Sequence, residues 1–323
     1  MIGDRLALAP EVAAALADGR PVVALESTLI SHGLPYPQNL DVARASEAAV
    51  RVSGAVPATV AIHDGRLLVG LDEAALEALA TAPSGSVRKA ARPSLAIALA
   101  AGGWAATTVS ATMIAAHAVG IRVFATGGIG GVHRGALGGS PASGSPASGS
   151  PATLDISSDL EELGRTPMVV VCAGPKAILD VPATLEYLET RGVPVVTIGQ
   201  AELPGFYSRS SGLPSPLTAP DVAGAAAIAR VQLELGLGGI LVCVPVPEAE
   251  ALPGDVARNA IEQAIRDADA AGIHGPATTP LLLARIAQIT DGASIRANTA
   301  LIVNDARVAG ELAVALSTED VER

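Results

Sequence analysis

Short apolar runs alternate with alanine-rich helical stretches along most of the chain. The runs that predict β-strands are 22–25, 58–62, 107–109, 123–126, 169–172, 195–198 and 240–244. The stretches that predict α-helices are 10–18, 39–53, 73–80, 93–100, 111–119, 182–190, 220–235, 256–271 and 279–289. A last helix is expected from about 296, interrupted and then resuming after 305. Alternation of this kind predicts a layered α/β fold.

Several of the predicted strands are apolar at every position instead of at alternate positions. Residues 22–25 read VVAL and residues 169–172 read VVVC. Strands with this pattern are buried on both faces, as in a parallel sheet covered by helices on both sides. The segment 63–66, His-Asp-Gly-Arg, joins two apolar runs and predicts a tight hairpin turn. We therefore expect an α/β/α sandwich with a central, largely parallel or mixed sheet.

Composition and charge exclude several classes of protein. The formal net charge is −11 and the chain has no basic run, so a nucleic-acid partner is not expected. The apolar runs fall short of the roughly 18 residues that a membrane helix needs, and the N-terminus does not resemble a signal peptide. Cys172 and Cys243 lie inside apolar runs, so we expect buried, unbridged thiols and a cytoplasmic protein.

One low-complexity tract interrupts the alternation of strands and helices. Residues 138–153 contain the unit Ser-Pro-Ala-Ser-Gly twice and offer no side chain that could anchor a core. The tract predicts a flexible, exposed loop. Because the strand–helix pattern continues on both sides and a long loop costs little closure entropy, we expect a single catalytic domain over residues 1–323.

Lysine is unusually scarce in this chain. Lys89 and Lys176 are the two lysines of the sequence, and every other basic side chain apart from histidine is arginine. Arginine replaces a solvated surface lysine at little cost, but it cannot lose its proton or form an imine. The two lysines are therefore candidates for chemistry that requires a primary amine. The alternative is that two surface lysines persist by chance.

Two potentially reactive side chains directly follow predicted strands. Glu26 comes after the run 22–25, and Lys176 comes four residues after the run 169–172. Burial at a strand end favours the uncharged form of either group, which suits Glu26 to general acid work and Lys176 to nucleophilic attack. Ligands of open α/β sheets bind at the carboxyl ends of the strands. A hydrogen-bonding role for Glu26 is equally compatible with its position.

A glycine-rich turn follows the predicted strand 123–126. Gly127, Gly128, Gly130 and Gly131 precede His133 and Arg134, a pattern in which backbone N–H groups can approach an anion. The turn matches neither the dinucleotide-binding nor the phosphate-loop motif. We interpret it as a candidate phosphate cradle, with a purely structural turn as the alternative.

Two carboxylates and two hydroxyls lie close together after the low-complexity tract. Asp155, Ser157, Ser158 and Asp159 could hold sugar hydroxyls or a hard divalent cation that keeps several waters, as Mg²⁺ and Mn²⁺ do. A serine of this segment could instead cap a helix that has Asp159 in its first turn. The two interpretations are compatible.

Ten segments of the chain together resemble the pseudouridine-5'-phosphate glycosidase family. In chain order they are VVALESTLISHGLPYPQN, GAVPATVAI, VRKA, TTVSATM, VFATGGIGGVHRGA, DISSDL, VVVCAGPKAILD, TLEYLETRGVPV, FYSRSSGLP and TPLLLAR. They span most of the chain, and several are longer and more specific than a short motif.

The resemblance implies an activity, a metal and an assembly. The family reversibly cleaves pseudouridine 5'-phosphate to uracil and ribose 5-phosphate, with a bound divalent metal, typically Mn²⁺, and its members form trimers. By motif match, the proton donor is Glu26, the nucleophile is Lys176 and the metal ligand is Asp155. The implied substrate contacts are Lys89, Val109, Ser157, Ser158, Asp159 and Asn298, and the glycine turn adds Gly127, Gly128 and His133 as our own candidates.

The bond to be broken joins carbon to carbon, so protonation of a glycosidic heteroatom cannot release the base. Opening of the ribose, followed by an imine between Lys176 and the sugar, would solve this problem. One rival hypothesis is a Schiff-base lyase that acts on another sugar phosphate. Another is a sugar-phosphate binding protein without turnover, against which the intact set of acid, amine and metal aspartate argues.

Overall fold

The computed structural model describes residues 2–137, 153–271 and 278–318. Its strands form one 11-stranded sheet whose main path runs β1-β4-β3-β2-β7-β8-β11-β9-β10, with β6 pairing to β3 and β5 to β6. The pairs β3–β4 and β3–β6 are antiparallel, and the other described pairs are parallel. The strands are β1 (Leu6–Leu8), β2 (Val22–Leu25), β3 (Val56–His63), β4 (Arg66–Val69), β5 (Arg88–Ala90), β6 (Trp104–Thr107), β7 (Val123–Ala125), β8 (Val169–Cys172), β9 (Val195–Ile198), β10 (Leu217–Ala219) and β11 (Ile240–Cys243).

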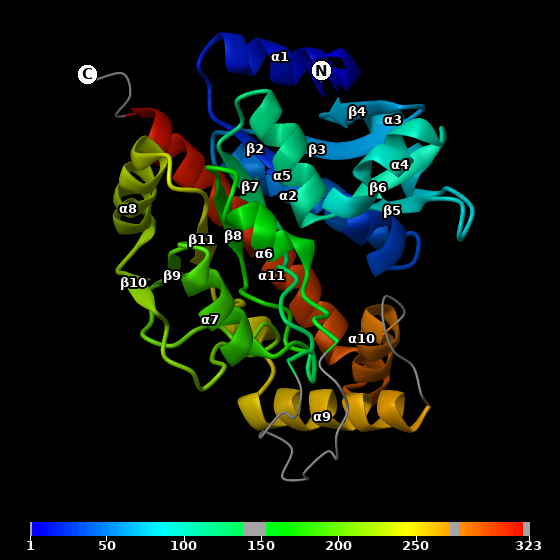
Figure 1. Ribbon diagram of the computed structural model, residues 1–323, viewed down its shortest axis with the longest axis vertical. Coiled ribbons are helices and arrows are strands. Elements are labelled where there is room, and N and C mark those ends of the chain that lie inside the picture. Colours follow the sequence, from blue (N-terminus) through cyan, green and yellow to red (C-terminus); the bar gives the residue numbers. More distant parts are fainter. Residues whose placement is uncertain (1, 138–152, 272–277, 319–323) are drawn as a thin grey trace.

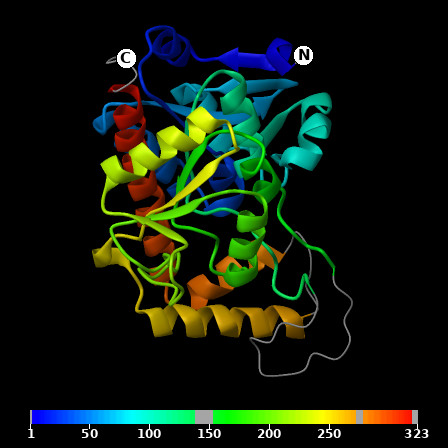
Figure 2. The same cartoon turned by 60° about the vertical axis from the view of Figure 1, so that its left-hand side comes forward.

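Helices cover both faces of the sheet, and α9 lies across one end of the molecule, opposite α1 (Figures 1 and 2). In the described residues, the α-helices are α1 (Pro10–Ala17), α2 (Gln38–Val52), α3 (Glu73–Ala80), α4 (Leu95–Ala100), α5 (Val109–Ala118), α6 (Ser158–Leu163), α7 (Val181–Thr190), α8 (Val222–Leu235), α9 (Gly254–Ala270), α10 (Thr278–Ile289) and α11 (Ala293–Thr318). The predicted layered α/β/α architecture with a largely parallel sheet is confirmed.

Alternate residues of the central strands supply two separate cores. Val22 and Ala24 of β2 pack with side chains of α1, α5, α6 and α7, whereas Val23 and Leu25 pack with α2, α8 and α11. The same division holds in β8, where Val169 and Val171 lie on the α11 side. The continuous apolar runs of the sequence therefore arise because both faces of these strands are covered.

The predicted hairpin is confirmed at the turn between β3 and β4. His63 pairs with Arg66 in an antiparallel register. Asp64 and Gly65 have φ values of 45° and 77°, the left-handed backbone that a two-residue turn of this type requires. The Asp-Gly pair meets this requirement at low cost, since glycine carries no Cβ.

Two predicted elements differ from the structure. The strand expected at 107–109 ends at Thr107, and Val109 instead begins α5. The last helix is not interrupted: α11 runs from Ala293 to Thr318, because its apolar side packs along the sheet over its length. The short strands β1, β5 and β10 were not predicted, and the short helix α6 corresponds to the serine-capped helix that the sequence offered as an alternative at Asp159. The predicted 138–153 loop lies, but for its last residue, outside the described residues.

The carboxyl ends of β2, β7 and β8 lie next to one another. These strands are parallel neighbours, with Leu25 opposite Ala125 and Ala125 opposite Val171. Whatever follows them in the sequence therefore meets at one edge of the sheet. Among the described residues, no helix is long and apolar enough to cross a membrane. Both cysteines are buried and free, as the sequence predicts.

Candidate active site

Glu26 lies at the end of β2, where it is held by the neighbouring strand. The residue is 9% exposed, and its Oε1 accepts a hydrogen bond of 2.8 Å from Oγ1 of Thr126, the residue that follows β7. Both residues line a small hollow together with Ile302 of α11. The contact fixes the carboxyl group at the junction of two strand ends.

The end of β6 is joined to the residues that follow β2. The Ser27 N–H donates to the Thr107 carbonyl at 3.3 Å, and the Thr107 N–H donates to the Ser27 hydroxyl at 2.9 Å. Thr28 also donates its hydroxyl to the Thr107 carbonyl, at 2.8 Å. These bonds bring the start of α5, and with it Val109, to the same edge of the sheet as Glu26.

The two lysines lie within electrostatic reach of each other. Although Lys89 is partly exposed on β5, burial of its ammonium group and then the charge of Lys176 lower its pKa. The carboxylates of Glu26 and Asp159 act in the opposite direction. Lys89 therefore lies within electrostatic range of Lys176 and of the carboxylates of Glu26 and Asp159.

Asp159 connects α5 to the glycine turn. Its Oδ1 accepts from the Ser110 N–H and its Oδ2 from the Gly130 N–H, each at 3.0 Å, and the residue is 6% exposed. A carboxylate is well placed here, because the first N–H groups of α5 lack partners within the helix and carry partial positive charge. The carboxylate therefore holds the two segments in a set relation.

Ser157 and Ser158 lie against the same first turn of α5. Ser157 caps α6, since its hydroxyl accepts from the Asp159 N–H at 3.2 Å, and the Ser158 and Ser110 hydroxyls are 3.2 Å apart. The structure thus brings the 157–159 segment next to the start of α5. The sequence-based interpretation of a serine helix cap is confirmed.

The glycine turn is packed too closely for larger side chains. A Cβ on Gly127 would come within 2.7 Å of Ile302, and one on Gly128 within 2.5 Å of the Phe206 ring. The Ile129 N–H donates to the Gly174 carbonyl at 3.2 Å, and the Lys176 N–H returns to the Ile129 carbonyl at 3.1 Å. Packing thus accounts for glycine at 127 and 128, and the phosphate role of the turn stays a prediction.

His133 and Asp155 are joined at the end of the glycine turn. The His133 N–H donates to the Asp155 carbonyl at 3.0 Å, and the imidazole Nδ1 lies 3.8 Å from the Asp155 carboxylate, which is 47% exposed. Asn298 lies on α11 one turn before Ile302, the residue that contacts the glycine turn. His133 and Asp155 thus lie at the end of the glycine turn, and Asn298 lies on the helix that packs against the start of this turn.

Comparison with known proteins shows which family this chain belongs to. The family profile described as "Indigoidine synthase A like protein" matches residues 11–315. A protein of Paracoccus denitrificans named pseudouridine-5'-phosphate glycosidase is 54% identical, over 97% of this chain and 99% of its own length. A protein of the same name from Caldanaerobacter subterraneus is 51% identical, over 96% of each chain.

The chain belongs to the pseudouridine-5'-phosphate glycosidase family. The resemblance seen in its sequence segments is thereby confirmed. Among solved structures, the prealnumycin C-glycosynthase AlnA in complex with ribulose 5-phosphate has a TM-score of 0.86 and 39% identity, over 98% of this chain and 99% of that one. An indigoidine synthase A-like protein of Thermotoga maritima has a TM-score of 0.81 and 32% identity, over 97% of this chain and 96% of that one.

The described residues around Asp155 offer few ligands for a metal ion. No group of three or more His, Cys, Asp and Glu side chains in the described part of the chain could hold a metal ion. Asp155 offers one half-exposed carboxylate, with His133 as its neighbour. Mn²⁺ or Mg²⁺ bound here would therefore take water for most of its ligands, which hard divalent cations tolerate.

Two residues near the predicted set were not identified from the sequence. Thr126 binds Glu26, and a hydroxyl directly after an apolar strand could have indicated it. His32 lies in a π-helical turn at Leu29–Gly33, and burial and then the charge of Lys89 lower its pKa, while a bond to the Arg88 backbone acts against this. Such turns are frequent at functional sites, but π geometry has no clear sequence signal.

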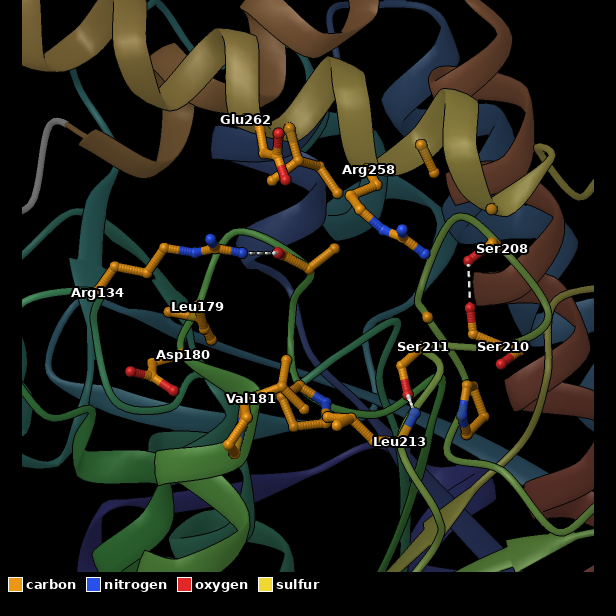
Figure 3. Close-up of a pocket in the computed structure, with 18 residues that line it drawn as sticks. Arg134, Leu179, Asp180, Val181, Ser208, Ser210, Ser211, Leu213, Arg258 and Glu262 are labelled. Atoms are coloured by element: carbon orange, nitrogen blue, oxygen red, sulfur yellow. Dashed lines mark hydrogen bonds between the residues drawn. The ribbon is translucent and has the colours of Figure 1, made fainter. Parts of the chain in front are cut away.

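Arg134 does not remain with the glycine turn. It lines a cavity of about 310 Å³ (Figure 3). The wall of this cavity includes Pro175 and Ala177, the two neighbours of Lys176 in the sequence. Glu26, Lys89 and Lys176 are not among the lining residues. This cavity is therefore distinct from the edge at which the predicted catalytic side chains meet.

Proposed function

We propose that this protein is a pseudouridine-5'-phosphate glycosidase, which reversibly cleaves the C-glycosidic bond to give uracil and ribose 5-phosphate. Relatives with this name match nearly the whole chain. The observation that carries the assignment of the site is the strand order: Glu26, the glycine turn and the Lys176 segment follow β2, β7 and β8, which are parallel neighbours. The electrostatic influence of Lys176, Glu26 and Asp159 on Lys89 agrees with this arrangement. An acid and an amine at one strand edge are the groups that cleavage through an imine requires.

The first step is opening of the ribose ring. Glu26 gives a proton to the ring oxygen as the bond from that oxygen to C1' breaks, and the electrons come from the uracil ring. Thr126 holds the carboxyl group through the 2.8 Å bond to Oε1, which leaves Oε2 to face the sugar. This arrangement suits a general acid, because the proton donor has a set position before the substrate binds.

The second step is attack by the Lys176 amine on C1', which returns the electrons to the uracil. Protonation of uracil at C5 then lets the carbon–carbon bond break, as the nitrogen lone pair forms an iminium with C1'. Water hydrolyses the iminium and releases ribose 5-phosphate. Arginine cannot take this role, since it neither deprotonates nor forms an imine, in keeping with the retention of lysine at 176.

The phosphate and the sugar oxygens are assigned to the residues around the start of α5. Lys89 supplies a positive charge, Val109 a backbone N–H in the first turn of α5, and Ser157 and Ser158 their hydroxyls. Asp159 acts mainly by holding this group together, since both of its oxygens already accept backbone bonds. Gly127, Gly128, His133 and Asn298 complete the proposed substrate contacts.

A divalent metal, Mn²⁺ by family resemblance, belongs to the proposal as a ligand of Asp155. When bound, it would supply positive charge near the substrate oxygens, while His133 orients the carboxylate from the side. A homotrimeric assembly and a cytoplasmic location also belong to the proposal. Light scattering on the purified protein and cell fractionation test these two points.

Borohydride trapping tests the lysine assignment. Ribose 5-phosphate is added with sodium borohydride, and the protein is digested and analysed by mass spectrometry. Because Lys89 and Lys176 are the two lysines of the chain, the position of a lysine adduct is unambiguous. We expect the adduct on Lys176 and its loss in Lys176→Ala, and an adduct confined to Lys89 would refute the assignment.

A second candidate function is a Schiff-base enzyme for another sugar phosphate. It is favoured by one observation: the similar AlnA structure is described as a C-glycosynthase in complex with ribulose 5-phosphate. Uracil release from pseudouridine 5'-phosphate, followed with and without Mn²⁺, separates the two. Trapping on Lys176 without uracil release would favour the second function.

A further inference from the structure

The cavity next to the Lys176 turn has a lining of apolar side chains mixed with charged groups and hydroxyls. Its volume of about 310 Å³ has room for a small organic molecule, and Leu179, Val181, Leu213 and Ile261 contribute to its walls. Figure 3 shows Arg134 extending into the cavity from the left and Arg258 descending from α9, with its guanidinium on the side of Ser208. Apolar walls with a few converging polar groups are typical of ligand sites.

The two arginines have donors that the described residues leave unused. Arg134 makes one long hydrogen bond, 3.5 Å from Nη2 to the Ala177 carbonyl. Arg258 makes no hydrogen bond or ion pair with the residues that the structure describes. Burial lowers the pKa of Arg134, with Asp180 and Glu262 acting against this. A partly desolvated guanidinium with unused donors favours an anion that can accept from its fork of N–H groups.

Two carboxylates and several hydroxyls also line the cavity. Asp180 caps α7 by accepting from the Ala183 N–H at 3.1 Å, and Glu262 lies 3.9 Å from Arg266 one turn along α9. Ser208 and Ser211 donate their hydroxyls to backbone carbonyls at 2.7 and 2.8 Å. Among the described residues, the donors of the cavity that stay open to a ligand are thus mainly those of the two arginines.

We propose that this cavity is a second binding site, for a small phosphate monoester that carries an apolar or planar body. Arg134 and Arg258 supply the cationic donors for the phosphate, and the apolar walls take the body. The ligand packs against Pro175 and Ala177, the two neighbours of Lys176. Occupancy of the site is therefore expected to affect the segment that carries the lysine without any contact to Glu26 or Lys89.

Calorimetric titration of the full-length protein with uridine 5'-monophosphate tests the proposal. The wild type is expected to show binding at both the proposed active site and the cavity. Arg258→Ala and Arg134→Ala should each weaken the cavity component by about tenfold or more, and Lys89→Ala should weaken the other component alone. Arg165→Ala, at an exposed arginine in the turn that follows α6, is the matched control and should leave both components unchanged.

Two further measurements decide the chemistry of the ligand. Uridine, which lacks the phosphate, should bind the cavity at least tenfold more weakly than its monophosphate, and inorganic phosphate should compete. Arg258→Ala should still release uracil from pseudouridine 5'-phosphate at the wild-type rate when the cavity is empty. The proposal is overturned if neither arginine variant alters the titration, or if uridine binds the cavity as tightly as the monophosphate.

Discussion

Replacement of Asp159 by asparagine tests whether this carboxylate organises the active site. The side chain receives one N–H from Ser110 and one from Gly130, each at 3.0 Å. Asparagine has nearly the same shape but a single acceptor oxygen. One of the two backbone donors must then face an NH₂ group, so that α5 and the glycine turn are no longer held together on both sides.

The magnitude follows from those two bonds. A hydrogen bond to a charged group contributes about 1.5–3 kcal/mol, and a buried donor left without a partner costs about 1–3 kcal/mol. We expect Asp159→Asn to lower the free energy of unfolding by about 3 kcal/mol. For a chain of this size that corresponds to a decrease in melting temperature of about 5 °C or more.

The same substitution should also change substrate affinity. The Asp159 carboxylate favours the protonated form of Lys89, so its loss lowers the pKa of Lys89 further. As the pH rises, Lys89 then loses its positive charge earlier, and KM for pseudouridine 5'-phosphate should rise at a lower pH than in the wild type. Uracil release measured across a pH series detects this shift.

Asp221→Asn is the matched control, because Asp221 caps α8 by accepting the Gly224 N–H at 2.8 Å and is not among the predicted site residues. It should lose stability without a change in the pH dependence of KM. The reasoning is wrong if Asp159→Asn melts like the wild type, or if the two variants have the same KM profile.

Three further predictions concern the glycine turn, the second lysine and the metal. Gly128→Ala should destabilise the protein by about 1–3 kcal/mol, because its Cβ would lie 2.5 Å from the Phe206 ring, whereas Gly3→Ala, with open space around it, should melt like the wild type. Lys89→Arg should abolish the rise in KM at alkaline pH, since arginine stays charged where the lowered pKa of Lys89 does not allow it; an unchanged profile would exclude Lys89 from substrate binding. Asp155→Asn should weaken activation by Mn²⁺ at least about tenfold after chelation, and equal activation in both proteins would remove Asp155 from the metal site.

The local pattern of the sequence was sufficient to predict most of the architecture. The runs 22–25 and 169–172 are apolar throughout and match β2 and β8, and the helix at 73–80 matches α3. Periodicity identifies such elements because burial on one or both faces leaves a repeat in the sequence. The hairpin at Asp64-Gly65 was predictable for a similarly local reason, namely the backbone angles that this turn requires.

Short edge elements were not predictable in the same way. Strand β5, which carries Lys89, has three residues and pairs with β6 alone among the described strands. Its sequence, RKA, has neither an apolar run nor a clear alternation. The partner strand, and not the residues themselves, makes this segment extended, because edge pairing depends on what lies beside it.

The sequence alone determined which groups are available: two lysines, Glu26 directly after a buried strand, and Asp155 and Asp159 within five residues of each other. Tertiary structure decided which of them meet. Lys89 lies within electrostatic range of Lys176, 87 positions away. This is because β5 pairs with β6, the end of β6 is bonded to Ser27 after β2, and β7 and β8 continue the sheet from β2. The tertiary structure also places Arg134 in a separate cavity, away from the glycine turn. Such encounters depend on strand order and helix packing, which bring distant segments together through contacts that no local pattern encodes.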